Sequence, residues 1–156
     1  MADPQAQAAP VVRTVRTQWK GRLRSEARVR DCVPFIIDEP PNRGGRFEHP
    51  TPAEYTLAAL TGCAAAHVEM FAKEVGMPLV DLTIEGRLTM LPVRSEEDGG
   101  GGGVQGIELE LTVTSPGTAE QFRRVRELLR SQCVLYRFAK AATKVEDRWM
   151  LVSPAG

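Results

Sequence analysis

Thr51-Pro52-Ala53-Glu54 opens a run, continued by Tyr55-Thr56-Leu57-Ala58-Ala59-Leu60-Thr61-Gly62-Cys63, that has the features of a long helix. Thr51 can cap the helix, Pro52 suits its first position, and Glu54 completes a capping box. Apolar side chains then recur every three or four residues, at Leu57, Leu60, Ala64, Val68, Phe71 and Val75. The glycine and proline that follow end this pattern, so we expect a helix over residues 51–75 that packs one apolar face against a core.

Alternation of apolar and polar residues predicts strands on both sides of this helix. Before the helix, the alternation runs from Val15 to Val29 with a turn at Gly21, and a short strand follows over residues 33–37. After the helix, the pattern predicts strands over 80–90, 107–113 and 143–152. Because most of these strands are connected like hairpins, we expect a largely antiparallel sheet.

A second helix is predicted from Thr118-Ala119-Glu120-Gln121, which is another capping box. Its apolar positions are Phe122, Val125, Leu128, Leu129 and Cys133. The element order predicts an α+β fold, in which a curved antiparallel sheet packs on two central helices. Because 156 residues suit one domain, we expect a disordered tail over residues 1–10 and a single domain over residues 11–156.

Charge and hydropathy patterning argue against several function classes. Lys and Arg number 20, as do Asp and Glu, so the chain lacks the cationic excess of a generic nucleic-acid or anionic-membrane binder. No apolar run approaches the roughly 18 residues of a membrane span. The N-terminus has no basic segment followed by an apolar one, as a secretory signal would. We therefore expect a cytoplasmic protein that binds neither nucleic acid nor membrane.

The cysteines Cys32, Cys63 and Cys133 are odd in number, which argues against a framework of structural disulfides. Cys63 lies in mid-helix among small residues, and Cys133 lies at the end of the second helix. A nucleophilic thiol needs a nearby cation to hold it ionised, and a permanently charged arginine suits this best. The other interpretation of Cys63 is a small buried apolar residue, and Cys32 is expected to be structural or incidental.

His67 follows Cys63 by four residues and therefore shares its face of the predicted helix. Such a pair could supply two metal ligands or a thiolate–imidazolium pair. His49 and Cys32 are isolated, so the sequence offers no second pair of ligands. A histidine that faces solvent or an interface is the alternative, and we predict neither a metal nor a cofactor.

The combination of these features resembles the OsmC/Ohr family of thiol-dependent peroxidases. The resemblance is carried by the loop Asp38-Glu39-Pro40-Pro41-Asn42-Arg43-Gly44-Gly45, by the helix that leads to Cys63, and by the distal second cysteine. It covers about residues 11–152. The resemblance implies an OsmC-like fold and an intertwined homodimer with its sites at the subunit interface.

The activity implied by the resemblance is the reduction of organic hydroperoxides. Cys63 matches the peroxidatic cysteine, which becomes a sulfenic acid, and Cys133 matches the resolving cysteine, which forms a disulfide with it. The resemblance also implies a dithiol reductant of the lipoyl type. The family's catalytic arginine lies on the first strands in one branch and in the glycine loop in another, so Arg22 and Arg46 are both candidates.

Two departures from the family pattern keep another hypothesis open. The family usually has a carboxylate directly after the helix-opening proline, where this chain has Ala53, and Glu54 follows one position later as the candidate that orients the arginine. Cys133 is followed by Val134-Leu135 where the family commonly has Pro-Val. The alternative is a catalytically weak or inactive OsmC-like dimer with a binding or stress-related role.

Overall fold

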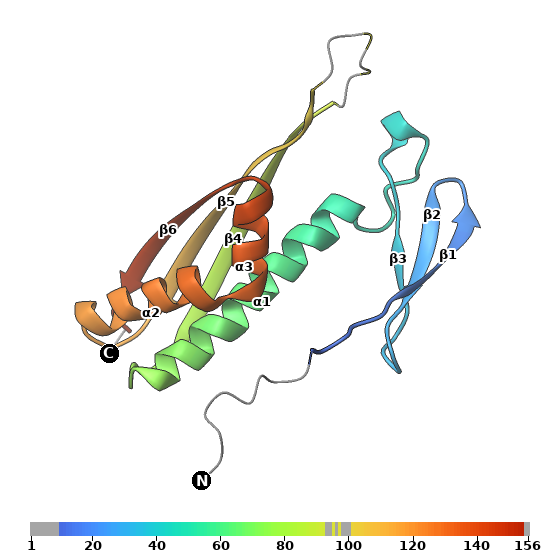
Figure 1. Ribbon diagram of the computed structural model, residues 1–156. Coiled ribbons are helices and arrows are strands. Elements are labelled where there is room, and N and C mark those ends of the chain that lie inside the picture. Colours follow the sequence, from blue (N-terminus) through green and yellow to red (C-terminus); the bar gives the residue numbers. More distant parts are fainter. Residues whose placement is uncertain (1–9, 93–94, 96, 98–100, 155–156) are drawn as a thin grey trace. The chain divides into compact units, whose positions relative to one another are not determined.

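The computed structural model describes residues 10–92, 95, 97 and 101–154 (Figure 1). The chain divides into two compact units, Met1–Pro52 and Ala53–Gly156. The described residues form three α-helices, a short 3₁₀ helix and two three-stranded sheets, which confirms the predicted α+β class. The tail predicted over residues 1–10 lies outside the described residues apart from Pro10, and the single domain over residues 11–156 stays a prediction.

The N-terminal unit is built on an antiparallel sheet of β1 (Arg16–Gly21), β2 (Arg24–Arg28) and β3 (Phe35–Ile37), in that order. The predicted turn at Gly21 is confirmed, because φ is 88° at Gly21, 50° at Arg22 and 60° at Leu23. Glycine adopts this left-handed region freely, whereas residues with a side chain enter it at a cost. Arg22 lies in this turn between β1 and β2, and its side chain is exposed.

The C-terminal unit has a second sheet, in the order β4 (Asp81–Leu91), β5 (Gly103–Thr114) and β6 (Lys144–Val152). β4 and β5 pair in antiparallel fashion, as predicted, but β5 and β6 pair in parallel. A parallel pair needs a long crossover connection. The helices α2 (Ala119–Gln132) and α3 (Val134–Ala142) supply it, so the largely antiparallel arrangement that we expected has one exception.

Helix α1 (Pro52–Glu74) and the central strand β5 provide most of the core. Burial alternates along β5, where Ile107, Leu109, Leu111 and Val113 are all buried. The apolar stripe predicted for α1 joins the same cluster through Leu60, Ala64, Val68 and Phe71. Helix α2 adds Val125, Leu128 and Leu129. The central strand therefore anchors α1 and the α2–α3 crossover in one apolar core.

No helix in the described part of the chain combines the length and the apolar character needed to cross a membrane.

The capping box predicted at the start of α2 is confirmed, and it gives a stability prediction. The Thr118 hydroxyl accepts from the Gln121 N–H at 3.2 Å, and the Gln121 side chain accepts from the Thr118 N–H at 2.9 Å. Thr118→Ala should lower the free energy of unfolding by about 1 kcal/mol, because the hydrogen bond from the Gln121 N–H to the Thr118 hydroxyl is lost. Urea denaturation measures this change, and Thr118→Ser should retain most of the wild-type stability. Equal losses in the two variants would contradict the capping role.

Candidate active site

Cys63 lies near the middle of α1, beside the buried stripe rather than within it. Leu60, Ala64 and Val68 are buried, whereas Cys63 is half-buried and packs against the edge of the core. Cys63 therefore contacts apolar neighbours on one side, while part of the residue stays exposed to solvent.

Cys133 is the single residue between α2 and α3, and it caps both helices. Its φ of −66° and ψ of 117° are extended, which interrupts the helix for one residue. The Cys133 N–H still donates to the Leu129 carbonyl, and its carbonyl accepts from the Arg137 N–H, each at 3.0 Å. The break therefore costs Cys133 no backbone hydrogen bond, and it leaves a fully buried side chain.

The predicted place of Cys133 at the end of the second helix is confirmed, but α3 was not predicted. Its apolar residues Leu135, Phe138 and Ala142 recur at spacings of three and four, which is a helical signal. The chain therefore forms two helices with a bend at Cys133, where we predicted one helix that ends there.

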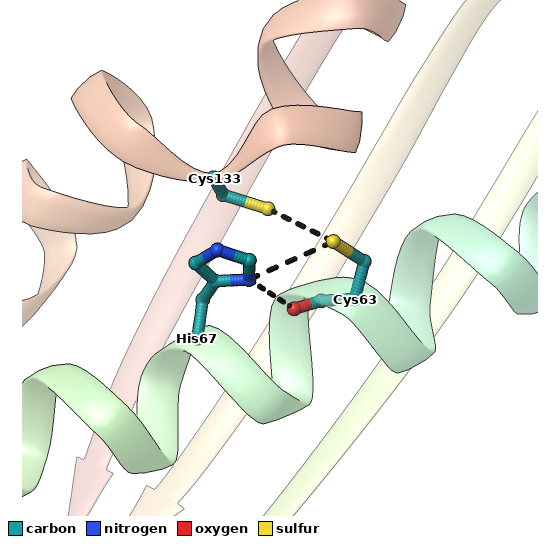
Figure 2. A group of neighbouring side chains, drawn as sticks. All are labelled: Cys63, His67 and Cys133. Atoms are coloured by element: carbon teal, nitrogen blue, oxygen red, sulfur yellow. Dashed lines mark hydrogen bonds between the residues drawn. The ribbon is translucent and has the colours of Figure 1, made fainter. Parts of the chain in front are cut away.

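The two thiols and an imidazole meet in one cluster (Figure 2). The Cys63 Sγ lies 3.7 Å from the Cys133 Sγ and 3.6 Å from the His67 Nδ1. The His67 Nδ1 also lies 2.8 Å from the carbonyl oxygen of Cys63, so this nitrogen carries the proton and donates to the carbonyl. Both cysteines are free thiols, and their sulfurs need to approach by only about 1.7 Å to reach the length of a disulfide bond.

Burial raises the pKa of the Cys133 thiol, and the neighbouring Cys63 thiol raises it further. The backbone N–H groups of Tyr136 and Leu135 act in the opposite direction but do not outweigh these effects. Cys133 therefore stays protonated at neutral pH. Because it is also fully buried, the half-buried Cys63 is the sulfur of the pair that is available to an incoming reactant.

A buried carboxylate, Asp147 on β6, ties together the elements around Cys133. The Arg130 side chain of α2 donates to it from Nη2 to Oδ2 at 2.8 Å, and its Nε–H is shared between Oδ2 at 3.0 Å and Oδ1 at 3.2 Å. Tyr136 of α3 donates to Oδ1 and Trp149 donates to Oδ2, each at 2.6 Å. Because Arg130 precedes Cys133 by three residues and Tyr136 follows it by three, Asp147 holds both sides of the bend.

Removing the Asp147 charge should loosen this bend and change the acid sensitivity of the fold. Burial opposes ionisation of Asp147, but the hydrogen bonds from Arg130, Tyr136 and Trp149 outweigh it, and its pKa is lowered. Asp147→Asn should reduce the free energy of unfolding by about 2 kcal/mol near pH 7. A lowered folded-state pKa stabilises the fold above the pKa of an unfolded aspartate, about 3.9, and this stabilisation is lost as the pH falls through the folded value.

Denaturant unfolding at a series of pH values measures this effect. The gap in stability between the wild type and Asp147→Asn should narrow steadily on acidification below about pH 4. Asp81→Asn, at an exposed position of β4, is the control and should leave the pH profile unchanged. A gap that stays constant down to pH 2 would show that the Asp147 charge does not support the fold.

The predicted arginines belong to the N-terminal unit, whereas the cysteine cluster belongs to the C-terminal unit. The buried Asp38 organises the loop that carries Arg46, because its carboxylate accepts from the N–H groups of Glu39, Arg46 and Glu48 at 2.8, 3.3 and 3.2 Å. Burial opposes ionisation of Asp38, but these bonds outweigh it and its pKa is lowered. The exposed Arg46 side chain pairs with Glu48 at 3.8 Å.

Arg22 and Glu54 are also exposed, Arg22 in the turn between β1 and β2 and Glu54 in the first turn of α1. The roles of Arg22, Arg46 and Glu54 toward Cys63 stay predictions. Cys32, which we expected to be structural or incidental, is exposed in the N-terminal unit.

An apolar pocket of about 330 Å³ lies in the C-terminal unit, between α1, β4, β5 and α3. Leu60, Leu88, Ile107, Leu135 and Phe138 are among the residues that line it. Leu60 lies one helical turn before Cys63, and Leu135 lies two residues after Cys133. The pocket is therefore lined in part by α1, which carries Cys63, and by α3, which begins directly after Cys133.

Comparison with known proteins identifies the family. The sequence profile of OsmC-like proteins matches residues 44–147. The chain belongs to the OsmC-like protein family. The resemblance stated from the sequence is thereby confirmed, and the matched residues include both cysteines of the cluster. A search of the curated proteins finds no match to this OsmC-like chain.

Solved structures of the family share the fold. An OsmC-like protein from Mycoplasma pneumoniae has a TM-score of 0.79 at 14% identity, over 92% of this chain and 99% of that one. An organic hydroperoxide resistance protein OsmC from Legionella pneumophila has a TM-score of 0.72 at 14% identity, over 91% and 98%. The organic hydroperoxide resistance protein OhrB of Bacillus subtilis has a TM-score of 0.61 at 20% identity, over 89% and 98%.

Proposed function

We propose that this OsmC-like protein is a thiol peroxidase that reduces organic hydroperoxides through Cys63 and Cys133. The observation that carries the proposal is the 3.7 Å contact between two free sulfurs that lie 70 residues apart in the chain. The half-buried Cys63 is the nucleophile, and the buried Cys133 is the resolving thiol. The names of the proteins from Legionella pneumophila and Bacillus subtilis agree with this substrate class.

The reaction proceeds in two displacement steps. The Cys63 thiolate attacks one oxygen of the hydroperoxide, the O–O bond breaks, and the alkoxide takes a proton and leaves as the alcohol. Cys63 is then a sulfenic acid. The Cys133 sulfur attacks the Cys63 sulfur, the S–O bond breaks, and hydroxide leaves as water with the thiol proton of Cys133. Two thiols are oxidised to a disulfide while one hydroperoxide is reduced, and a dithiol of the lipoyl type returns the pair to thiols.

The apolar pocket supports an organic rather than an inorganic substrate. Its lining by Leu60, Leu88 and Phe138 offers an alkyl or aryl group an environment free of charged side chains. Hydrogen peroxide has no apolar group to bury there. We therefore infer that the organic part of the hydroperoxide lies in this pocket while its O–O bond reaches Cys63.

Counting free thiols tests the two-cysteine mechanism. Reduced protein treated with a small excess of cumene hydroperoxide should lose two thiols per chain, and one equivalent of alcohol should form. Cys63→Ser should keep the thiol of Cys133 in its reduced form, whereas Cys133→Ser should form a sulfenic acid at Cys63 that a dimedone-type reagent traps. Cys32→Ser is the matched control and should behave like the wild type. If micromolar hydroperoxide causes no thiol loss, the proposal is wrong, and the non-enzymatic binding or stress-related role is favoured.

An arginine that stabilises the Cys63 thiolate is part of the proposal, and Arg22 and Arg46 are the candidates. Replacing the arginine that serves Cys63 with alanine should lower kcat/KM by about 10²-fold, the usual loss for one electrostatic stabiliser of a transition state. Replacement with lysine should rescue it poorly, because lysine lacks the guanidinium fork. Glu54→Gln should lower kcat/KM less if Glu54 orients that arginine.

Kinetics of Arg22→Ala, Arg46→Ala and Glu54→Gln with cumene hydroperoxide measure these effects. Arg43→Ala, in the same loop as Arg46 and also exposed, is the control. Wild-type kcat/KM in both Arg22→Ala and Arg46→Ala would remove these arginines from the mechanism.

We also propose that the protein acts in the cytoplasm as a homodimer with its sites at the subunit interface. Large apolar side chains are exposed on the C-terminal unit, among them Met70, Phe138 and Met150, and exposed apolar surface favours association.

A further inference from the structure

Cys63, Cys133 and His67 form a group whose ligand atoms all lie within 4.8 Å of one another. Two thiols and an imidazole are a donor set that zinc prefers. With zinc–sulfur bonds of about 2.3 Å and zinc–nitrogen bonds of about 2.0 Å, a tetrahedral site separates its sulfurs by about 3.8 Å and a sulfur from a nitrogen by about 3.5 Å. The observed separations are 3.7 Å for Cys63 Sγ to Cys133 Sγ and 3.6 Å for Cys63 Sγ to His67 Nδ1.

We propose that the reduced protein binds one zinc ion through Cys63, Cys133 and His67, with a fourth position open to water. The zinc proposal does not rest on the proposed peroxidase activity, although both involve the sulfurs of Cys63 and Cys133. On binding, the two thiols release two protons and form two thiolate bonds to the ion. The charge of the zinc and its two thiolates sums to zero, which suits a cluster in which Cys133 is fully buried.

His67 can ligate without disturbing α1. Its Nδ1 now donates to the Cys63 carbonyl at 2.8 Å, and this bond is lost when Nδ1 binds the ion. The Cys63 carbonyl lies inside α1, where the backbone N–H four residues later is its regular partner, so it keeps a hydrogen bond. The His67 ring also rests against Phe71, with 5.6 Å between ring centroids, which limits its rotation near the sulfurs.

The zinc site and the disulfide exclude each other, because both need the sulfurs of Cys63 and Cys133. Zinc bound to the two thiolates withdraws the pair from oxidation, and oxidation of the pair to a disulfide removes two of the three ligands. The oxidation state of one cysteine pair therefore sets whether the chain holds a metal ion.

Metal titration of the full chain tests the site. Metal-free protein reduced with a phosphine is titrated with Co²⁺, whose ligand-field and thiolate charge-transfer bands report a tetrahedral thiolate site, and then with Zn²⁺, which displaces it. The wild type should bind one ion per chain. Cys63→Ser and His67→Ala should each weaken binding by more than the 10- to 100-fold that loss of an outer-shell partner costs. Cys32→Ser and His49→Ala are the matched controls and should bind like the wild type.

Oxidised wild-type protein provides a test that needs no substitution at the buried Cys133. Diamide, which forms the disulfide without peroxide, should release the bound zinc, measured by elemental analysis after gel filtration, and reduction should restore binding. Failure of the reduced chain to bind, or unchanged affinity in Cys63→Ser and His67→Ala, would overturn the proposal. Thiol loss with hydroperoxide is measured on metal-free protein. The two proposals are therefore tested by separate experiments, and the failure of one does not decide the other.

Discussion

The candidate site depends on the carboxylate of Asp147, because this one group holds both sides of the bend at Cys133. Its partners come from three elements, Arg130 on α2, Tyr136 on α3 and Trp149 on β6. The Asp147 carboxylate thus adds side-chain hydrogen bonds to the backbone hydrogen bonds that Cys133 makes with Leu129 and Arg137 at the break. Because Cys133 lies at this bend, the network that holds the bend also holds the Cys133 sulfur near that of Cys63.

The bend gives the cysteine pair its asymmetry. Cys133 is fully buried and protonated, whereas Cys63 is half-buried on the surface of α1. This difference in burial underlies the proposed assignment of Cys63 as the attacking sulfur and Cys133 as the resolving sulfur. The sulfur–sulfur distance of this pair and the distance from Cys63 Sγ to His67 Nδ1 match two edges of a tetrahedral metal site. The proposed redox chemistry and the proposed metal binding therefore use the same atoms of this cluster and compete for them.

Most elements of the fold were predictable because their signals are local. The α1 stripe and the capping box at Thr118 lie within a few residues of each other in the chain, and both predictions are confirmed. The parallel pairing of β5 with β6 was not predictable in this way. The pairing depends on how α2 and α3 pack, because their packing sets where β6 begins relative to β5. No local sequence pattern specifies that packing. Helix α3 had a periodic signal of its own, but the break at Cys133 hides it within the pattern of α2.

The sequence by itself determined the α+β class, the candidate cysteines Cys63 and Cys133, and the helical face that Cys63 shares with His67. These follow from residue spacing, since periods of two and 3.6 and a separation of four residues translate directly into geometry. Only the tertiary structure decided that Cys133 meets Cys63, that its side chain is buried, and that Asp147 anchors the bend between its two helices. Contacts between residues 70 positions apart depend on how the core packs, and no local pattern encodes that distance.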